Sequence, residues 1–139
     1  KLELGNKEAK PVALTTTPDN KLYPEILTDG IVFLSADPEG NTLNTLKWVK
    51  ADATIADITL DIEVNWSAKV GNGLLVAGLA SDGSTRIYSI TVAGAKTELY
   101  RTSQDVSEVA VSIDGSKLAI ISEGKISVIQ NTTALQLTK

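Results

Sequence analysis

Short runs of alternating apolar and polar residues, separated by turn dipeptides, recur along the chain. In the clearest run, 108–113, alternation predicts a strand with three apolar residues on one face: Val109, Val111 and Ile113. Asp114-Gly115 then predicts a tight turn, because glycine accepts a positive φ and aspartate tolerates one. Further runs at 118–121, 125–129 and 134–137 complete a predicted four-stranded meander.

The same order of strand, turn, apolar strand, turn and strand occurs twice upstream. The first copy has runs at 23–27, 31–34 and 45–49, with Asp29-Gly30 as its first turn. The middle copy has runs at 62–66, 74–79, 87–92 and 98–100. The copies start at residues 23, 62 and 108, and a period of about 40–45 residues with four strands per unit is typical of propeller blades.

These patterns predict an all-β protein of about three four-stranded antiparallel, propeller-type blades that do not complete a ring. The blades are expected at about 21–57, 58–103 and 104–139. Residues 1–20 are expected to be a linker, or an added strand formed by 12–16. A β-sandwich of about ten short strands explains the alternation and the turn spacing as well, and it remains the alternative.

One segment resembles the blade motif of TolB-type, WD-related β-propellers. In 109–119 an apolar strand is followed by Ser-x-Asp-Gly, a basic residue and a second apolar strand. Asp29-Gly30 matches the same outline, whereas the middle copy departs from it, with Gly71-Asn72-Gly73 at that turn and Asp82-Gly83 one hairpin later. The resemblance implies an architecture and no particular activity, since the motif is turn chemistry.

A second resemblance is narrower and covers one blade. A strand ending in Trp66, an apolar strand at 74–78 and a strand ending in Ala93-Gly94 are similar to a blade of LpqB-type actinobacterial lipoproteins. Those are envelope proteins whose propeller is thought to act on a sensor kinase. The resemblance implies an extracytoplasmic, non-catalytic role with a protein partner.

Composition narrows the chemistry that the chain can perform. Its 139 residues include no Cys, His or Met, and the formal net charge is −4. Without Cys and His there is no disulfide, no thiol or His-dependent nucleophile and no ordinary zinc site. The excess of acids over bases argues against nucleic acid as a partner, and no apolar run approaches the ~20 residues that span a membrane. The missing Met leads us to expect a processed or excised piece of a longer protein.

Carboxylate chemistry passes this filter, but no group of acids stands out. In one continuous strand Asp57, Asp61 and Glu63 would share a face and could hold calcium; they could equally be solvated residues of a loop and an outer strand. Their spacing lacks the dense pattern of a calcium loop, and no two of the 17 acids stand out as a catalytic pair. The sequence therefore predicts no catalytic residue, no metal and no cofactor.

The large aromatic residues are the best candidates for a contact surface. Trp66 and Tyr88 lie within alternating strands and are expected to pack. Trp48 has lysines at 47 and 50 around it and is the predicted binding residue, exposed for a protein or carbohydrate contact. Glycosylation acceptor patterns occur at 65–67 and 131–133, and carry no meaning in a bacterial protein.

Propellers close with about 4–8 blades, so three blades need additional ones, from the parent chain or from a second copy in a homodimer. We expect a non-catalytic fragment of an extracytoplasmic protein, and more narrowly of an envelope lipoprotein, that acts as a protein-binding scaffold or signalling accessory. The alternative is an accessory or carbohydrate-binding propeller part of a hydrolase.

Overall fold

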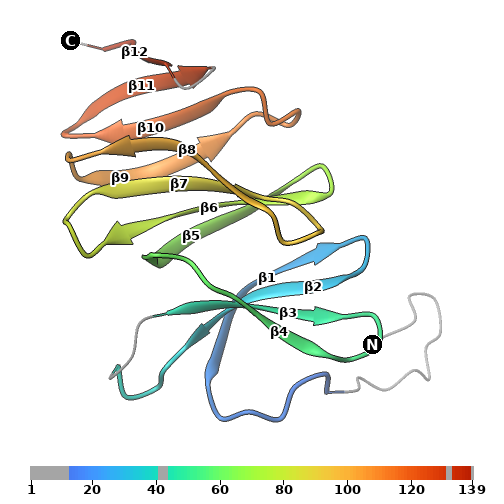
Figure 1. Ribbon diagram of the computed structural model, residues 1–139. Helices are drawn as coiled ribbons and strands as arrows, with labels where there is room; N and C mark the ends of the chain where they lie inside the picture. The colour runs from blue at the N-terminus through green and yellow to red at the C-terminus, as the bar shows by residue number, and fades with distance from the viewer. Residues whose placement is uncertain (1–12, 41–43, 131–132, 139) are drawn as a thin grey trace, which may run out of the picture.

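A computed structural model of the chain describes residues 13–40, 44–130 and 133–138 (Figure 1). Strands are the regular elements among these residues, which include turns and loops but no helix. The strands are β1 (Asn20–Leu27), β2 (Gly30–Ala36), β3 (Thr45–Lys50), β4 (Ile55–Ile58), β5 (Ile62–Val70), β6 (Gly73–Ala80), β7 (Thr85–Ile90), β8 (Lys96–Thr102), β9 (Val106–Val111), β10 (Leu118–Ser122), β11 (Lys125–Gln130) and β12 (Thr133–Gln136).

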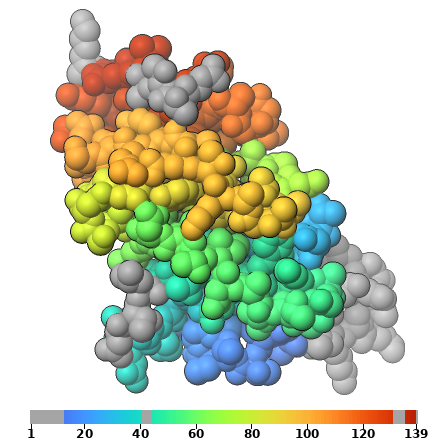
Figure 2. All heavy atoms as spheres, viewed as in Figure 1, coloured from blue at the N-terminus to red at the C-terminus, as the bar shows by residue number. Residues whose placement is uncertain are grey.

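Four consecutive strands form each of three antiparallel sheets. The first sheet is β1–β4, the second is β5–β8 and the third is β9–β12, and within each the strands lie in chain order. The sheets stack in the same order, from blue to red in Figure 1, and their atoms form successive bands in Figure 2. The first strands of neighbouring sheets contact each other, β1 with β5 and β5 with β9.

The expected all-β fold is confirmed, with some differences in the strands. A sandwich has two sheets, whereas the described strands form three. Strand β9 ends at Val111, so the prediction that Ile113 shares a strand face with Val109 and Val111 is wrong; Ile113 lies in the following loop and is fully exposed. Residues 13–16 are not a strand, and Val12 of the predicted strand lies outside the described residues.

Three hairpins close on the same side-chain chemistry. At 52–54, 82–84 and 114–116, one aspartate oxygen accepts the backbone N–H and the hydroxyl of the Thr or Ser two residues later, at 2.5–3.1 Å. The middle residue has a positive φ in all three. In the first two hairpins it is the left-handed last residue of a three-residue loop, and in the third it lies within a four-residue loop. These loops follow β3, β6 and β9, which are different strands of their sheets. The shared pattern is therefore Asp-x-Ser/Thr, with Ala or Gly in the middle, and it marks a turn and not a fixed position in the repeat.

Apolar residues fill both spaces between the sheets. Val64, Val76 and Tyr88 face the first sheet, in a cluster that includes Val32, Leu46 and Trp48. On the opposite face of the second sheet, Leu75, Ala77 and Ile87 pack against the third sheet's Leu118, Ile120 and Ile129. Strand β6 is buried on both faces, which explains its nearly unbroken apolar sequence.

The two outermost sheet faces differ. On the first sheet, Phe33 and Val49 are buried, and Leu14 and Thr15 line the same hollow as these two side chains. On the third sheet, the residues that alternate with the packed Ile120 and Ile129 face away from the core. They include Ile121, Ile126, Val128 and Leu135. Ile126 is 40% exposed and Leu135 is 66% exposed, so this face is apolar and open.

Within the described residues there is no helix that is long and apolar enough to cross a membrane.

Candidate functional site

The first strand of every sheet is an edge strand with an irregular pairing. In β1 the register shifts between Leu22 and Glu25, and in β5 it shifts around Asn65. In β9 it shifts around Ser107, because Glu108 pairs with Ile121 while Val106 pairs with the next residue of β10. Such bulges interrupt the row of free backbone groups on an edge and redirect nearby side chains.

The bulges border two hollows between the first strands. One hollow, of about 280 Å³, lies between β1 and β5 and is lined by Tyr23, Asn65, Trp66 and Ser67. The other, of about 290 Å³, lies between β5 and β9 and is lined by Asn65, Trp66, Val106, Ser107, Glu108 and Val109. Since both contain Asn65 and Trp66, we describe them together as the first-strand groove.

Tyr23 is held in an unusual position beside this groove. Its φ is 50°, in the left-handed region that costs an L-residue free energy, and its side chain is 60% exposed. Pro24 follows in the same bulge and lacks a backbone N–H, so this part of the edge has one donor fewer. The bulge therefore holds an exposed aromatic ring next to the half-buried Trp66, which packs against the cluster between the second and third sheets.

A charged network lies on the face of the second sheet that packs against the first. The Arg86 side chain is 12% exposed; it donates to Asp61, to Asp82 at 2.6 Å and to the Ser84 hydroxyl at 3.1 Å. The Ser84 hydrogen bonds are the largest cause of the depressed pKa of Asp82, and the contact with Arg86 lowers it further. Arg86 therefore ties the link between β4 and β5 to the turn between β6 and β7.

Tyr88 extends the network toward the outer strand β8. Its hydroxyl lies 2.7 Å from Asp61 and 3.2 Å from Glu98, and Glu98 accepts two hydrogen bonds from Arg101, at 3.0 and 2.8 Å. The hydrogen bond from Tyr88 holds the pKa of Asp61 below its usual value, and Arg101 does the same for Glu98. Burial and the Asp61 carboxylate raise the pKa of Tyr88.

The charged groups of this network bind one another and hold two sheets together, which is a structural role. Each guanidinium faces at least one carboxylate, and each of these carboxylates accepts at least one hydrogen bond from within the network. Lys96 adds a second tie, donating to the Thr59 carbonyl at 2.9 Å. The network therefore fastens the first sheet to the second, and its groups are engaged with one another.

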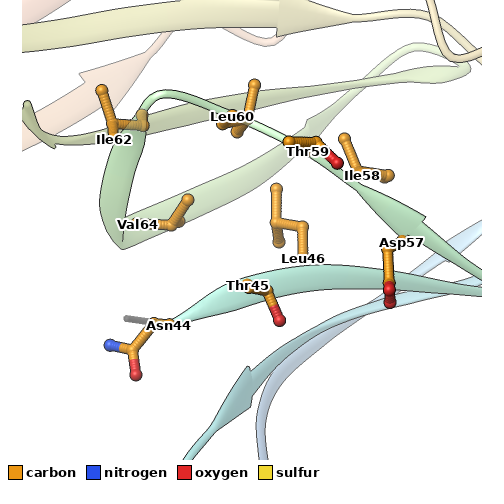
Figure 3. A pocket seen from close by; sticks show the side chains of 9 residues that line it. All are labelled: Asn44, Thr45, Leu46, Asp57, Ile58, Thr59, Leu60, Ile62 and Val64. Atoms are coloured by element: carbon orange, nitrogen blue, oxygen red, sulfur yellow. The ribbon is translucent and has the colours of Figure 1, made fainter. Parts of the chain in front are cut away.

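The wedge between the first and second sheets holds a small apolar hollow of about 120 Å³ (Figure 3). Leu46 points from β3 toward Val64 on β5, whereas Thr45 and Asp57 turn to the other side of their strands. Ile58 and Leu60 pack against the same cluster. This hollow is a gap in apolar packing, with no convergent polar groups to bind or transform a ligand.

The structure contradicts the premise that Trp48 is an exposed binding residue. Trp48 is 3% exposed and belongs to the cluster between the first two sheets. Strand β3 is an inner strand with both faces covered, so its neighbouring lysines do not place the ring at the surface. Its buried Nε1 has no hydrogen-bond partner among the described residues, and lies close to Gly30.

The three acids considered for calcium do not lie in one strand. Asp57 is in β4, Asp61 is in the link that follows and Glu63 is in β5. Within the described ranges no three acidic side chains come together as metal ligands would. Of the two glycosylation patterns, Asn65 is exposed on β5, while 131–132 lie outside the described residues.

Trp66 and Tyr88 do lie against the apolar clusters, as expected from their strands. The groove around Trp66 was not predicted. The sequence holds one signal for it, Tyr23-Pro24 within a predicted strand, because proline in a strand indicates an edge or a bulge. Nothing in the sequence brings Tyr23, Asn65 and Ser107 together, since they lie in three different sheets.

Comparison with known proteins gives no family model that matches this chain and no similar curated protein. The resemblance to propeller repeats therefore rests on the turn and strand patterns of the chain itself.

Proposed function

We propose that the three sheets are propeller-type blades and that the protein is a non-catalytic scaffold for a protein partner. The observation that carries this proposal is the contact between successive first strands, β1 with β5 and β5 with β9. In a propeller the blades radiate from their first strands around a central axis, and each blade is a four-stranded meander.

The turns support the same arrangement. The Thr28 hydroxyl donates to the Asn72 side chain at 2.8 Å, joining the first hairpin turn of the first sheet to the first hairpin turn of the second. Gly115, in the first turn of the third sheet, lies against Val70 at the end of β5. Equivalent turns of successive sheets therefore adjoin, which is how repeated units stack in register.

The open face of the third sheet fits a blade that awaits a neighbour. A blade packs on both faces, and the outward residues Ile126, Val128 and Leu135 are apolar, as the packed face is. We propose that another four-stranded sheet covers this face. In the isolated 139-residue chain that sheet must come from a second copy, whereas in a longer chain further blades supply it. A large open apolar surface would otherwise favour aggregation.

The non-catalytic part of the proposal rests on the absence of His and Cys from the chain and on the internal pairing of Arg86 and its neighbours. An extracytoplasmic location, and a role beside an envelope signalling protein, are further parts of the proposal that rest on the sequence resemblance.

Sedimentation velocity of the purified chain over a concentration series tests the blade proposal. We expect the wild type to self-associate through the open face and Leu135→Glu to weaken that association. Leu79→Glu is the matched control, because Leu79 is 51% exposed and lies on the second sheet. A wild type that stays monomeric at high concentration, or equal association of the wild type and Leu135→Glu, would contradict the proposal.

A further inference from the structure

We propose that the first-strand groove is a binding site for a neutral saccharide. The site consists of the two hollows on either side of β5, with Tyr23, Asn65 and Trp66 at its centre. Each hollow, at about 280 or 290 Å³, is close to the lower end of the range of small-molecule sites. This inference goes beyond the scaffold role, and its evidence is the set of aromatic and polar side chains that line the groove.

The aromatic side chains supply the apolar part of the site. Tyr23 is 60% exposed, and its backbone has the strained, left-handed φ of the bulge. The strain is not offset by burial of the ring, which leaves the ring free to contact a ligand. Trp66 is fixed from behind by the packed cluster between the second and third sheets. A pyranose ring has an apolar C–H face that can lie on such rings, and rigid aromatic side chains lose little entropy when they bind.

The polar side chains of the groove supply donors and acceptors. Within the described part of the chain, the side chains of Asn65 and Ser67 have no hydrogen bond. The amide of Asn65 and the hydroxyl of Ser67 can each donate and accept a hydrogen bond. They therefore match the hydroxyl groups of a saccharide, which also donate and accept. Glu108 is the one charged residue among the described residues that line the two hollows, but its pairing with Ile121 places its side chain on the outward face of the third sheet. The side chains that face the groove are therefore uncharged, which favours a neutral ligand over a charged one.

The bulges argue against the main competing ligand, an extended peptide. A peptide that adds to a sheet edge needs a continuous row of free N–H and C=O groups. That row is interrupted at Tyr23-Pro24 in β1, at Asn65 in β5 and at Ser107 in β9. The groove therefore offers side chains to a ligand in place of an unbroken backbone ladder.

The test is a titration of the intact 139-residue chain with cellotetraose and, separately, chitotetraose, followed by tryptophan fluorescence and by saturation-transfer NMR. We expect saturable binding of at least one tetrasaccharide, with a change in tryptophan emission, because Trp66 lines the groove whereas Trp48 is buried between the first two sheets. Tyr23→Ala should weaken binding about tenfold, which corresponds to about 1.4 kcal/mol. Asn65→Ala should weaken it in the same direction.

The matched control is Ile26→Ala, since Ile26 is 69% exposed on the same strand but outside the groove. This variant should bind as the wild type does. Circular dichroism of all variants separates loss of binding from loss of fold, and the exposed positions of Tyr23 and Ile26 make their variants the safest to compare.

Two results would overturn the saccharide site. One is the absence of saturable binding of either tetrasaccharide up to about 10 mM. The other is binding that Tyr23→Ala and Asn65→Ala leave unchanged. A displayed dodecapeptide library that enriches on the wild type and not on Tyr23→Ala, without saccharide binding, would assign the groove to peptides instead. None of these results bears on self-association through the third sheet, so this proposal and the blade proposal fail separately.

Discussion

The hydroxyl of Tyr88 stabilises the junction between the first and second sheets, and Tyr88→Phe measures by how much. The ring is 8% exposed and stays buried in the variant, so the change removes the hydroxyl alone. That hydroxyl lies 2.7 Å from Asp61 and 3.2 Å from Glu98, and it donates its single proton to one carboxylate at a time.

A hydrogen bond to a charged group contributes about 1.5–3 kcal/mol to stability. The Asp61 side chain is 58% exposed, so water replaces the lost donor and the cost falls toward the lower limit. We expect Tyr88→Phe to reduce the free energy of unfolding by about 1–1.5 kcal/mol at pH 7. The melting temperature should fall by about 3–6 °C for a chain of this length.

The effect should depend on pH in a defined direction. The Tyr88 hydrogen bond holds the pKa of Asp61 below its unfolded value, so the stabilisation is present above the unfolded pKa of about 4 and is lost as the pH falls through the folded pKa. The difference between the wild type and Tyr88→Phe should therefore shrink below about pH 4.

Urea unfolding followed by circular dichroism at pH 7 and pH 3 measures both effects. Tyr100→Phe is the matched control, because the hydroxyl of the half-buried Tyr100 has no hydrogen-bond partner in the described part of the chain. It should change stability by less than about 0.5 kcal/mol. A loss for Tyr88→Phe that is equal at the two pH values, or no loss at pH 7, would refute the reasoning.

Three further predictions concern turns and a close backbone approach. Ala53 has a φ of 67°, so Ala53→Gly should stabilise the protein by about 0.5–1 kcal/mol in thermal unfolding, and a destabilised variant would contradict the strain. A Cβ on Gly78 would overlap the Glu63 carbonyl oxygen, so Gly78→Ala should cost about 1–3 kcal/mol in urea unfolding; a neutral effect would show that the strands separate freely. The Ser112 hydroxyl lowers the pKa of Asp114 to about 2, so its carboxyl should titrate near pH 2 by NMR, and Ser112→Ala should move that midpoint toward the ordinary value.

The local sequence predicted which segments form strands better than it predicted where those strands end. Alternation and the Asp114-Gly115 turn correctly predicted β9 to β12, because each hairpin combines a buried face with a turn that suits its residues. Ile113 continued the alternation but lies in the loop, where a side chain has no face to bury. Strand β4 (Ile55–Ile58) was not predicted, since it has only four residues and begins after a turn that uses Ala53 in place of glycine.

The site was less accessible to sequence reasoning than the fold. The prediction for Trp48 failed because it weighed the charge of its neighbours, whereas exposure depends on whether a strand is at the edge or inside a sheet. The first-strand groove depends on three bulges in three sheets. Only the one at Tyr23-Pro24 leaves a trace in the local sequence, since proline is disfavoured inside a regular strand.

A crystal structure of the 139-residue chain tests the central claim most directly, namely that these sheets are blades radiating from their first strands. We predict that β1, β5 and β9 converge as they do here and that another four-stranded sheet covers Ile126, Val128 and Leu135. Strands rearranged into two packed sheets, or a third sheet whose outer face is covered by solvent alone, would contradict it.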